Sequence, residues 1–413
     1  MKLIVLIWLC VMVPSVSEAA TYYVDKHHPS ASNSNAGTST SAPWLTIGKC
    51  VSTMVAGDTC QIRAGTYLEY LTISTSGTAV NRITYRNYPG ETPIIDGSGT
   101  ATNQPTVWSQ PRLIKINADY ITLQGLEIKD PCSIAINIPS GADFAYLIDL
   151  HVHDCYLACY YIAGDNGRII NNHVHHAHDN IAPDNGGNAD CISITGSAGD
   201  HADAWLVEGN DLHDCSDDGL DTWVSGGSIG GHTIRNNIVH DIGIQNGNKN
   251  CYKLGGNQVG GYNLVYNNIA YNCGASGFNN NSGPANQLYN NIAYNTTSHC
   301  FLNYDNAGTY KNNIAVSCGG QAFFQSGPSN TQTTNSWNLG LTCTFASTTV
   351  GNENFLKHAV TDPCLAVGSN LSAIFTVDRL GVTRNAWDLG AYEGSPSGGG
   401  GGGGPGGGGA AGA

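Results

Sequence analysis

The sequence predicts an all-β fold, a right-handed parallel β-helix, in which short strands form a solenoid of stacked coils. Charged residues are only 12% of the 413-residue chain, about half the share that is typical of soluble domains. Gly, Asn, Ser and Thr are abundant, which favours a turn-rich β protein over a helical one. Beyond residue 115 a short motif repeats, at its shortest every 22 residues. That length fits one coil of three short strands.

The chain ends differ in composition from the rest. Lys2 precedes an apolar run from Leu3 to Val13, and small residues follow up to Ala20, so we expect residues 1–20 to be a secretory signal peptide. The run is too short for a membrane anchor, and no later segment could cross a bilayer. We expect residues 21–395 to form one β-helix domain, and the Gly-rich residues 396–413 to be a flexible tail.

The first hundred residues predict the beginning of the solenoid. Apolar residues recur at helical spacing between Trp44 and Val55, which indicates a short amphipathic helix that caps one end of the fold. The expected strands near this end are 22–25, 60–63, 67–73, 82–85 and 93–96. At the other end, residues 388–393 are expected to form a closing strand.

The repeated motif sets the coil boundaries. Its units begin at Leu126, Leu150, Asn172, Asn210, Asn237, Asn268, Asn291 and Asn313, at steps of 24, 22, 38, 27, 31, 23 and 22 residues. The longer steps predict coils with inserted loops, and these loops surround an acidic stretch from residue 180 to residue 256. Loops on a rigid scaffold often build a binding site.

From residue 172 onward the first position of each unit is Asn. Stacked coils lie about 4.8 Å apart, so an inward Asn amide can reach the backbone and the Asn of the next coil. We therefore expect an internal Asn ladder with a structural role. Its members are Asn172, Asn210, Asn237, Asn268, Asn291 and Asn313.

Strand alternation places a second column of residues on the outer surface. This column holds His153, His175, His213, His240, Tyr271 and Tyr294. Its members occur once per coil, with no second type of ligand converging on them. We expect a surface stack of imidazole and aromatic rings, and a metal site is the alternative.

Removal of the signal peptide would leave 13 of the 14 cysteines. Four of them occupy the same inward position of the repeated unit, in every second coil. Cysteines two coils apart are separated by about 10 Å, which is too far for a disulfide. We therefore expect Cys155, Cys215, Cys273 and Cys318 to be buried thiols. The pairs Cys50–Cys60 and Cys343–Cys364 are the disulfide candidates, and no cysteine or histidine spacing predicts a zinc site.

The acidic stretch contains three short motifs: Asn188-Ala189-Asp190, Asp217-Asp218-Gly219-Leu220-Asp221 and Cys251-Tyr252-Lys253-Leu254-Gly255-Gly256. Aligning the inward positions Ile192, Leu220 and Tyr252 places Asp190 beside Asp218, and Asp221 beside Lys253. Carboxylates this close raise one another's pKa values unless a cation neutralises them. An all-oxygen site suits Ca²⁺. The alternative is a set of solvated loop carboxylates with Lys253 as an ion-pair partner.

These three motifs, followed by Gly277-Phe278-Asn279, resemble those of family 9 polysaccharide lyases, the β-helical pectate lyases. The resemblance covers most of residues 21–395. It implies that Asp190, Asp217, Asp218 and Asp221 bind an essential Ca²⁺ and that Lys253 is the catalytic base. The sequence departs from the family pattern at Cys191, at Leu220 and at Cys251-Tyr252. These departures concern packing around the site and bear on substrate preference.

We therefore expect a secreted, monomeric, Ca²⁺-dependent pectate lyase that cleaves polygalacturonate by β-elimination. The net charge of −14 and the lack of a basic stripe argue against nucleic acid as a partner. Alternatives are a lyase for another uronate polymer, such as alginate or a glycosaminoglycan, and a non-catalytic β-helical adhesin or carbohydrate-binding protein. A glycoside hydrolase needs a pair of carboxyl groups and would leave Lys253 without a role.

Overall fold

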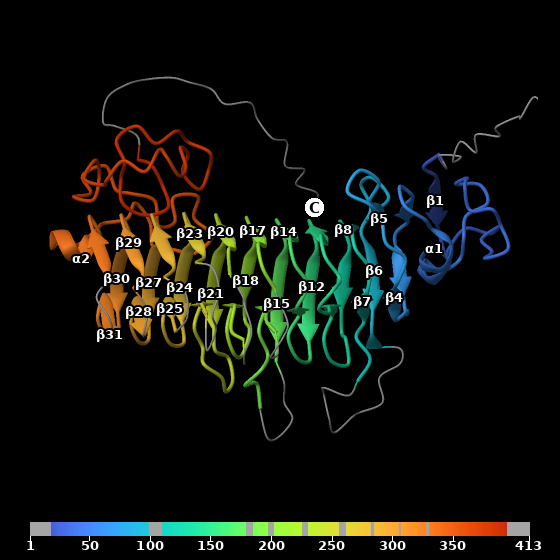
Figure 1. The fold of residues 1–413 in the computed structure, drawn as a ribbon, viewed down its shortest axis with the longest axis horizontal. Helices are drawn as coiled ribbons and strands as arrows, with labels where there is room; N and C mark the ends of the chain where they lie inside the picture. The colour runs from blue at the N-terminus through green and yellow to red at the C-terminus, as the bar shows by residue number, and fades with distance from the viewer. Residues whose placement is uncertain are drawn as a thin grey trace, which may run out of the picture.

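The computed structural model describes residues 18–98, 110–178, 185–196, 202–224, 230–255, 262–281, 285–304, 307–327 and 330–394. Within these ranges the chain winds into the predicted parallel β-helix (Figure 1). Residues 1–17 of the expected signal peptide and the tail 396–413 lie outside the described residues. Among those described, no helix has the length and apolar character needed to span a bilayer.

Three parallel sheets form the walls of the β-helix, and each complete coil contributes one strand to each sheet. The first sheet consists of β1 (Thr21–Val24), β2 (Thr59–Ile62), β5 (Ile83–Asn87), β8 (Ile121–Gln124), β11 (Tyr146–Ile148), β14 (Arg168–Ile170), β17 (Leu206–Glu208), β20 (Thr233–Arg235), β23 (Leu264–Tyr266), β26 (Gln287–Tyr289), β29 (Thr309–Lys311) and β32 (Thr331–Thr333). The second sheet consists of β3 (Gly65–Tyr67), β6 (Pro93–Asp96), β9 (Glu127–Lys129), β12 (His151–Cys155), β15 (His173–Ala177), β18 (Asp211–His213), β21 (Ile238–Ile242), β24 (Ile269–Cys273), β27 (Ile292–Thr296) and β30 (Ile314–Cys318). The third sheet consists of β4 (Leu71–Ile73), β7 (Ile114–Ile116), β10 (Ile136–Ile138), β13 (Tyr160–Ile162), β16 (Ile192–Ile194), β19 (Leu220–Asp221), β22 (Tyr252–Lys253), β25 (Phe278–Asn280), β28 (Phe301–Tyr304) and β31 (Phe323–Ser326).

The N-terminal elements agree with the sequence, with one exception. Helix α1 (Ile47–Thr53) caps the first coil through buried Ile47 and Cys50, as its apolar spacing predicts. The expected strand 67–73 is instead divided between β3 and β4, because the chain turns there from the second sheet to the third. A second short helix, α2 (Ser336–Leu339), follows the last strand.

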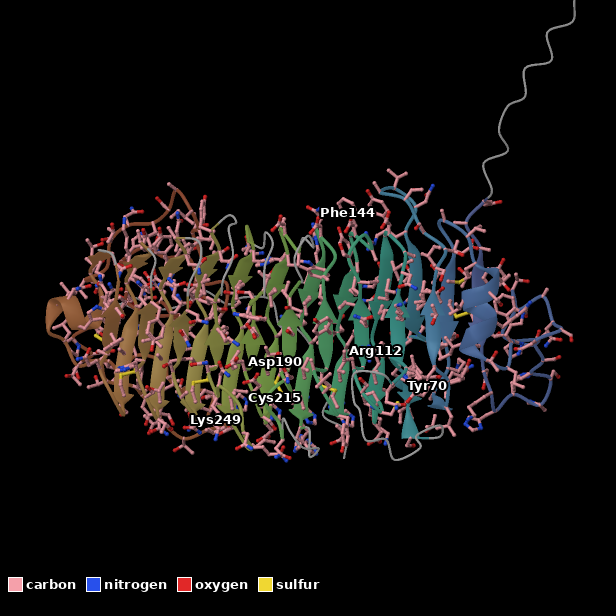
Figure 2. All side chains as sticks on the ribbon, turned by 60° about the horizontal axis from the view of Figure 1, so that its bottom comes forward. Tyr70, Arg112, Phe144, Asp190, Cys215 and Lys249 are labelled. Atoms are coloured by element: carbon pink, nitrogen blue, oxygen red, sulfur yellow. A yellow bond between two sulfur atoms is a disulfide. The ribbon has the colours of Figure 1, made fainter. Side chains whose placement is uncertain are left out.

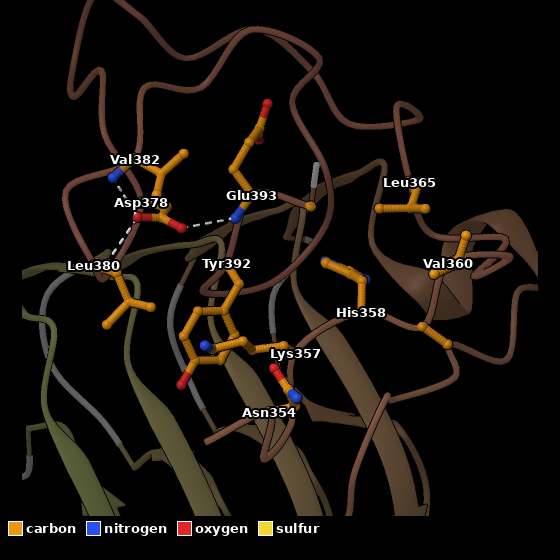
Figure 3. Close-up of a pocket in the computed structure, with 12 residues that line it drawn as sticks. Asn354, Lys357, His358, Val360, Leu365, Asp378, Leu380, Val382, Tyr392 and Glu393 are labelled. Carbon is orange, nitrogen blue, oxygen red and sulfur yellow. Dashed lines mark hydrogen bonds between the residues drawn. The ribbon is translucent and has the colours of Figure 1, made fainter. Parts of the chain in front are cut away.

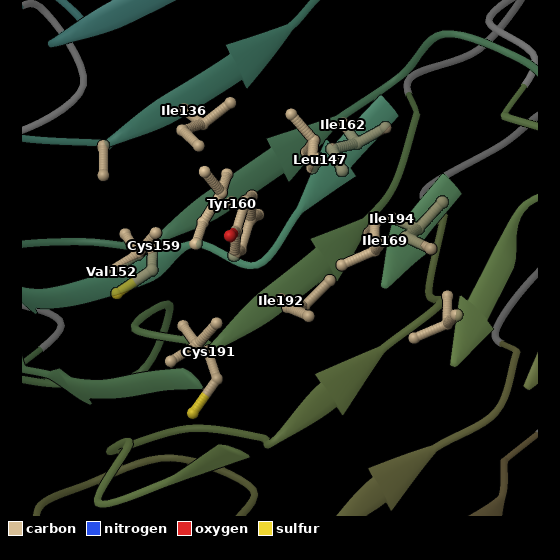
Figure 4. Packing of buried hydrophobic residues seen from close by; sticks show 14 of the residues in the cluster. Ile136, Leu147, Val152, Cys159, Tyr160, Ile162, Ile169, Cys191, Ile192 and Ile194 are labelled. Carbon is tan, nitrogen blue, oxygen red and sulfur yellow. The ribbon is translucent and has the colours of Figure 1, made fainter. Parts of the chain in front are cut away.

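The core fills the space between the three sheets. Inward side chains of successive coils stack directly on one another, as Figure 4 shows for Tyr160, Ile192, Ile162 and Ile194. The predicted column of inward residues along the third sheet is confirmed by the strand register, and its members are Ile192, Leu220, Tyr252, Phe278 and Phe301. This register fixes which outward side chains face the same surface.

The predicted Asn ladder is present. The backbone N–H of Asn172 donates to Asn210 Oδ1 at 2.8 Å, and the same bond repeats at 3.0 Å from coil to coil as far as Asn335. Each ladder side chain is at most 1% exposed. Buried backbone N–H groups at this corner therefore obtain their partners from the ladder side chains.

The expected stack of outward rings is confirmed as well, although its histidines are half-buried. The rings of His153, His175, His213 and His240 stack with centroids 4.8–5.1 Å apart, and Tyr271 continues the stack. Tyr271 is buried rather than exposed because Phe355 of the C-terminal segment covers it.

The prediction of four buried thiols is wrong. Their partners come from a second column of cysteines, each placed directly before an inward residue of the third sheet. The disulfides are Cys155–Cys159, Cys191–Cys215, Cys251–Cys273 and Cys300–Cys318. They close the corner between the second and third sheets, where Cα atoms are 5.3–5.6 Å apart. The predicted pairs Cys50–Cys60 and Cys343–Cys364 are confirmed.

The C-terminal segment, residues 340–394, packs against the outside of the last coils (orange to red in Figure 1). Phe375 and Trp387 contact Tyr266 and Tyr289 of the first sheet. The expected closing strand 388–393 is wrong, because this stretch is an irregular, buried loop. Its backbone carbonyls at Asp388 and Gly390 accept hydrogen bonds from the Asn290 side chain instead of pairing with a strand.

Candidate functional site

The five residues singled out by the sequence gather on the outer face of the third sheet. Asp190 lies two residues before β16, and it is placed near the middle of the long axis (Figure 2). Asp217 and Asp218 precede β19, which ends at Asp221, and Lys253 ends β22. Asp221 and Lys253 are register partners. The predicted grouping of all five residues is therefore present.

Gly219 allows the backbone to pass close to Val239 and Cys251 between Asp218 and Leu220. A Cβ atom there would lie 2.1 Å from Val239 Cγ1 and 2.7 Å from the Cys251 carbonyl oxygen. Only glycine fits without displacing these neighbours. Its presence allows Asp218 to turn toward the site while Leu220 continues into the core.

Lys253 forms ion pairs with two of the carboxylates. Its Nζ lies 2.9 Å from Asp221 Oδ2 and 3.1 Å from Asp218 Oδ2. The contact with Asp221 has hydrogen-bond geometry, whereas Asp218 Oδ2 is buried without a hydrogen-bond partner. We interpret the contact with Asp218 as electrostatic, because the distance is short but the orientation is poor.

Backbone N–H groups hold the other oxygen of each carboxylate. Asp218 N–H donates to Asp190 Oδ1 at 3.0 Å, and Trp223 N–H donates to Asp221 Oδ1 at 2.7 Å. The N–H of Asn248 donates to Asp217 Oδ1. These bonds fix the orientation of the carboxylates before any ligand arrives.

Two asparagines complete the site and were not predicted. Asn250 donates to Asp218 Oδ1 from its backbone N–H at 2.8 Å and from its side chain at 2.9 Å. Asn279, the register partner of Lys253, donates to Asn250 Oδ1 at 3.3 Å. Register could have found both, because Asn250 occupies the position of Asp190 and Asp218 one coil further on.

The site lies in a cavity of about 470 Å³. Polar side chains of Ser193, Thr195 and Asn281 line it, together with the rings of Tyr161 and Trp223. Lys253 Nζ is 5.9 Å from the centre of the Trp223 ring. A cavity with hydroxyl, amide and aromatic walls beside an acidic floor has the chemistry that polar saccharides need.

Burial and mutual repulsion perturb the acidic groups. Burial, together with Asp217, Asp221 and Asp218, raises the pKa of Asp190 well above its usual value. Burial and Asp218 raise the pKa of Asp217 to about 8. Burial also raises the pKa of Asp221, to about 6, although Lys253 opposes this shift. Burial lowers the pKa of Lys253, but the attraction of Asp221, Asp218 and Asp190 outweighs it, so this pKa is raised.

The carboxylates fit a divalent cation. One oxygen from each of Asp190, Asp218 and Asp221 lies within 4.8 Å of the others. Four ionised carboxylates and one ammonium would leave three uncompensated negative charges in a buried site, which costs free energy. All the candidate ligand atoms are oxygens, and this donor set suits Ca²⁺.

A second cavity, of about 370 Å³, lies within the C-terminal segment (Figure 3). Asp378 there accepts hydrogen bonds from the N–H groups of Leu380 and Val382, both at 2.8 Å, and of Glu393 at 2.9 Å. These bonds connect loops of the same segment. We interpret this cavity as part of the packing of the segment.

Comparison with known proteins agrees with this fold. The family model described as Pel9A-like, right handed beta helix region, matches residues 22–313. The chain belongs to this family. The match also confirms the right-handed β-helix that the sequence predicts and includes all five site residues.

Two curated proteins are similar in sequence. Pectate lyase L of Paenibacillus polymyxa (strain SC2) is 28% identical over 255 residues, which are 55% of this chain and 53% of that protein. The uncharacterized protein YwoF of Bacillus subtilis (strain 168) is 37% identical over 103 residues, which are 25% of this chain and 21% of that protein. The matches thus span about half or less of these relatives.

Two solved structures share the fold. The pectate lyase Pel9A structure has a TM-score of 0.74 at 19% identity, and the match covers 92% of this chain and 97% of that one. A rhamnogalacturonan lyase structure has a TM-score of 0.65 at 18% identity, with 83% and 97% covered. At these identities the likeness concerns the β-helix itself.

Proposed function

We propose that this protein is a secreted, Ca²⁺-dependent pectate lyase that cleaves polygalacturonate by β-elimination. The observation that carries the proposal is the position of Lys253, whose amine borders a buried carboxylate cluster at the floor of a polar cavity. Membership of the Pel9A-like family and the similarity to pectate lyase L support it. The six disulfides of the described residues support secretion.

In this proposal Asp190, Asp217, Asp218 and Asp221 hold the Ca²⁺ ion. Bound there, Ca²⁺ supplies the positive charge that neutralises the C6 carboxylate of a uronate and stabilises the enolate-like charge that develops during the reaction. The backbone bonds to Asp190, Asp217 and Asp221 keep their carboxylates in place, so little reorganisation is needed.

Lys253 is the base. Its neutral amine accepts the C5 proton, the electrons of the C5–H bond form a C4–C5 double bond, and the C4–O bond breaks with its electron pair. The products are a 4,5-unsaturated end and a free end on the departing chain, whose oxygen takes a proton from water. The amine can act only when it has lost its own proton.

The groups around Lys253 determine whether its amine is protonated. While Asp218 and Asp221 are unneutralised, they favour the ammonium form. Once their charge is compensated, burial favours the neutral amine. The proposal therefore requires both a filled cation site and alkaline pH.

The test is an assay with polygalacturonate at about pH 9, because a lysine loses its proton more readily at alkaline pH than at neutral pH. Purified protein is incubated with Ca²⁺ or with EDTA, and the ultraviolet absorbance of the unsaturated product is followed. We expect the absorbance to rise only with Ca²⁺. Full activity in EDTA at neutral pH would refute the proposal. A flat trace from folded, Ca²⁺-bound protein would also refute it for this polymer and lead to alginate, glycosaminoglycans and then the binding-protein alternative.

A further inference from the structure

The outer face of the second sheet carries more histidines than a single stack. His151 and His173 open β12 and β15, and His153 and His175 follow two residues later on the same strands. The expected stack thus has neighbours of the same ligand type, which favours the metal-site alternative. A second column of imidazoles lies beside the first, since strand alternation puts residues i and i+2 on one face.

We propose that His151, His173 and His175 form a binding site for a transition-metal cation of the zinc class. One ring nitrogen of each residue lies within 4.8 Å of the others. His151 Nε2 and His175 Nε2 are only 2.8 Å apart. This site is separate from the carboxylate cluster, because the two occupy different sheets of the β-helix.

The ring nitrogens of the three histidines lie in close nitrogen–nitrogen pairs, His151 Nε2 with His175 Nε2 and His173 Nε2 with His213 Nε2, each at 2.8 Å. Two ring nitrogens at hydrogen-bond distance cannot both carry a proton, so at least one of them is an acceptor. Each such pair therefore contains a ring nitrogen without a proton, and a nitrogen in that state can ligate a metal.

The distances suit zinc better than calcium. A Zn–N bond of about 2.0–2.1 Å places tetrahedral ligand nitrogens about 3.4 Å apart. His151 Nε2 and His175 Nε2 are 2.8 Å apart, and all three nitrogens lie within 4.8 Å of one another, so small ring movements would give the tetrahedral spacing. Three imidazoles leave the fourth position for water, and imidazole prefers zinc, copper and nickel to calcium.

Neighbouring carboxylates provide compensating charge. Asp154 accepts a hydrogen bond from His153 Nδ1 at 2.7 Å, and Glu127 lies 3.4 Å from His153 Nε2. Asp214 holds His213 Nδ1 at 2.7 Å in the same way. His153 and His213 both stack on the ring of His175, so these carboxylates place negative charge beside the proposed site.

The test uses Co²⁺ as a spectroscopic substitute for Zn²⁺. Full-length mature protein is purified without an oligohistidine tag, treated with EDTA and titrated with Co²⁺. Tetrahedral nitrogen ligation gives intense visible absorption, whereas an oxygen-only site gives weak absorption. We expect an intense band at submillimolar Co²⁺ that Zn²⁺ abolishes. A weak, oxygen-type spectrum would overturn the proposal.

Variants locate the site. The double variant His151→Asn/His175→Asn should weaken Co²⁺ binding at least about tenfold, while His27→Asn, an exposed histidine of the N-terminal region, should leave it unchanged. If the double variant misfolds, His173→Asn replaces it, because His173 is exposed. Equal binding by His173→Asn and wild type, or equal weakening by His27→Asn, would overturn the proposal. Ca²⁺-dependent lyase activity is measured separately, and its loss or presence does not bear on this outcome.

Discussion

Lys253 and Asp221 are register partners on adjacent strands of the third sheet, and their side chains are joined by a 2.9 Å ion pair. The β-helix thus places an amine and a carboxylate side by side at the spacing of one coil. Because the two residues are register partners, the sheet keeps their backbones one coil apart. The pairing links the protonation of the proposed base to the charge of the proposed cation site.

Replacing Asp218 by Asn should weaken Ca²⁺ binding at least about tenfold, because a buried charged ligand is lost. Asn250 can still donate to the amide oxygen of the variant, so the fold should survive. Calorimetric titration with Ca²⁺ measures the change. The matched control is Asp149→Asn on the exposed surface, which should bind Ca²⁺ as wild type does. Unchanged affinity in Asp218→Asn would remove Asp218 from the proposed ligands.

Ca²⁺ binding should release protons near neutral pH. The pKa of Asp217 is raised to about 8 and that of Asp190 is raised well above its usual value. A carboxyl group with a raised pKa is protonated below that pKa, so protons compete with the cation. Affinity should therefore increase as pH rises toward about 8 and level off above the pKa values. Titrations at pH 7 in buffers of different ionisation enthalpy reveal the released protons. Binding heats that do not depend on the buffer would contradict this prediction.

The Asn ladder should contribute strongly to stability. Asn268 Oδ1 accepts the backbone N–H of Asn237 at 3.0 Å, and its side chain donates to the Ile234 carbonyl at 2.8 Å. Asn268→Ala leaves these buried groups unpaired, at a cost of about 2–4 kcal/mol. Urea unfolding measures the loss. Asn354→Ala, at an exposed position, should change the free energy of unfolding by less than about 0.5 kcal/mol. Similar losses in both variants would argue against a special role for the ladder.

The disulfide nearest to Lys253 should stabilise the fold. Cys251 and Cys273 are 22 residues apart in sequence, and removing both sulfurs with Cys251→Ala/Cys273→Ala should cost about 2–4 kcal/mol. Thermal unfolding of the variant, compared with the wild type under oxidising and reducing conditions, measures this. A variant as stable as the oxidised wild type would contradict the assignment of this bond.

The fold and the site could be predicted from the sequence where they depend on residues at the same position of successive coils. A repeated Asn and a repeated inward residue fix the coil register, and this register brings Asp221 beside Lys253. The disulfides were missed because their partners lie in different columns. Cys215 pairs with Cys191 across the turn between the second and third sheets. Distances between equivalent positions of successive coils do not reveal which residues meet at that turn. Asn250 was missed for a different reason: it lies in the column of Asp190 and Asp218, but its amide resembles a structural turn residue until the acidic side chains around it are placed.

The C-terminal segment was the least predictable part. Its expected strand at 388–393 is a loop because apolar residues such as Leu389 pack against the outer surface of finished coils. Apolar residues can make this contact without the alternating sequence pattern by which a strand is recognised. Irregular segments of this kind are shaped by the surface they cover, which the sequence of the segment alone does not describe.

The most direct measurement is the rate of unsaturated product formation by Lys253→Arg at saturating Ca²⁺ and alkaline pH. Arginine can keep the ion pairs with Asp218 and Asp221 but cannot serve as a base, since its pKa is too high. We predict a loss of about 10²–10⁴ in rate with Ca²⁺ binding retained, and no loss in Lys311→Arg, the same change on the first sheet. A Lys253→Arg variant that keeps wild-type activity would contradict the assignment of Lys253 as the base.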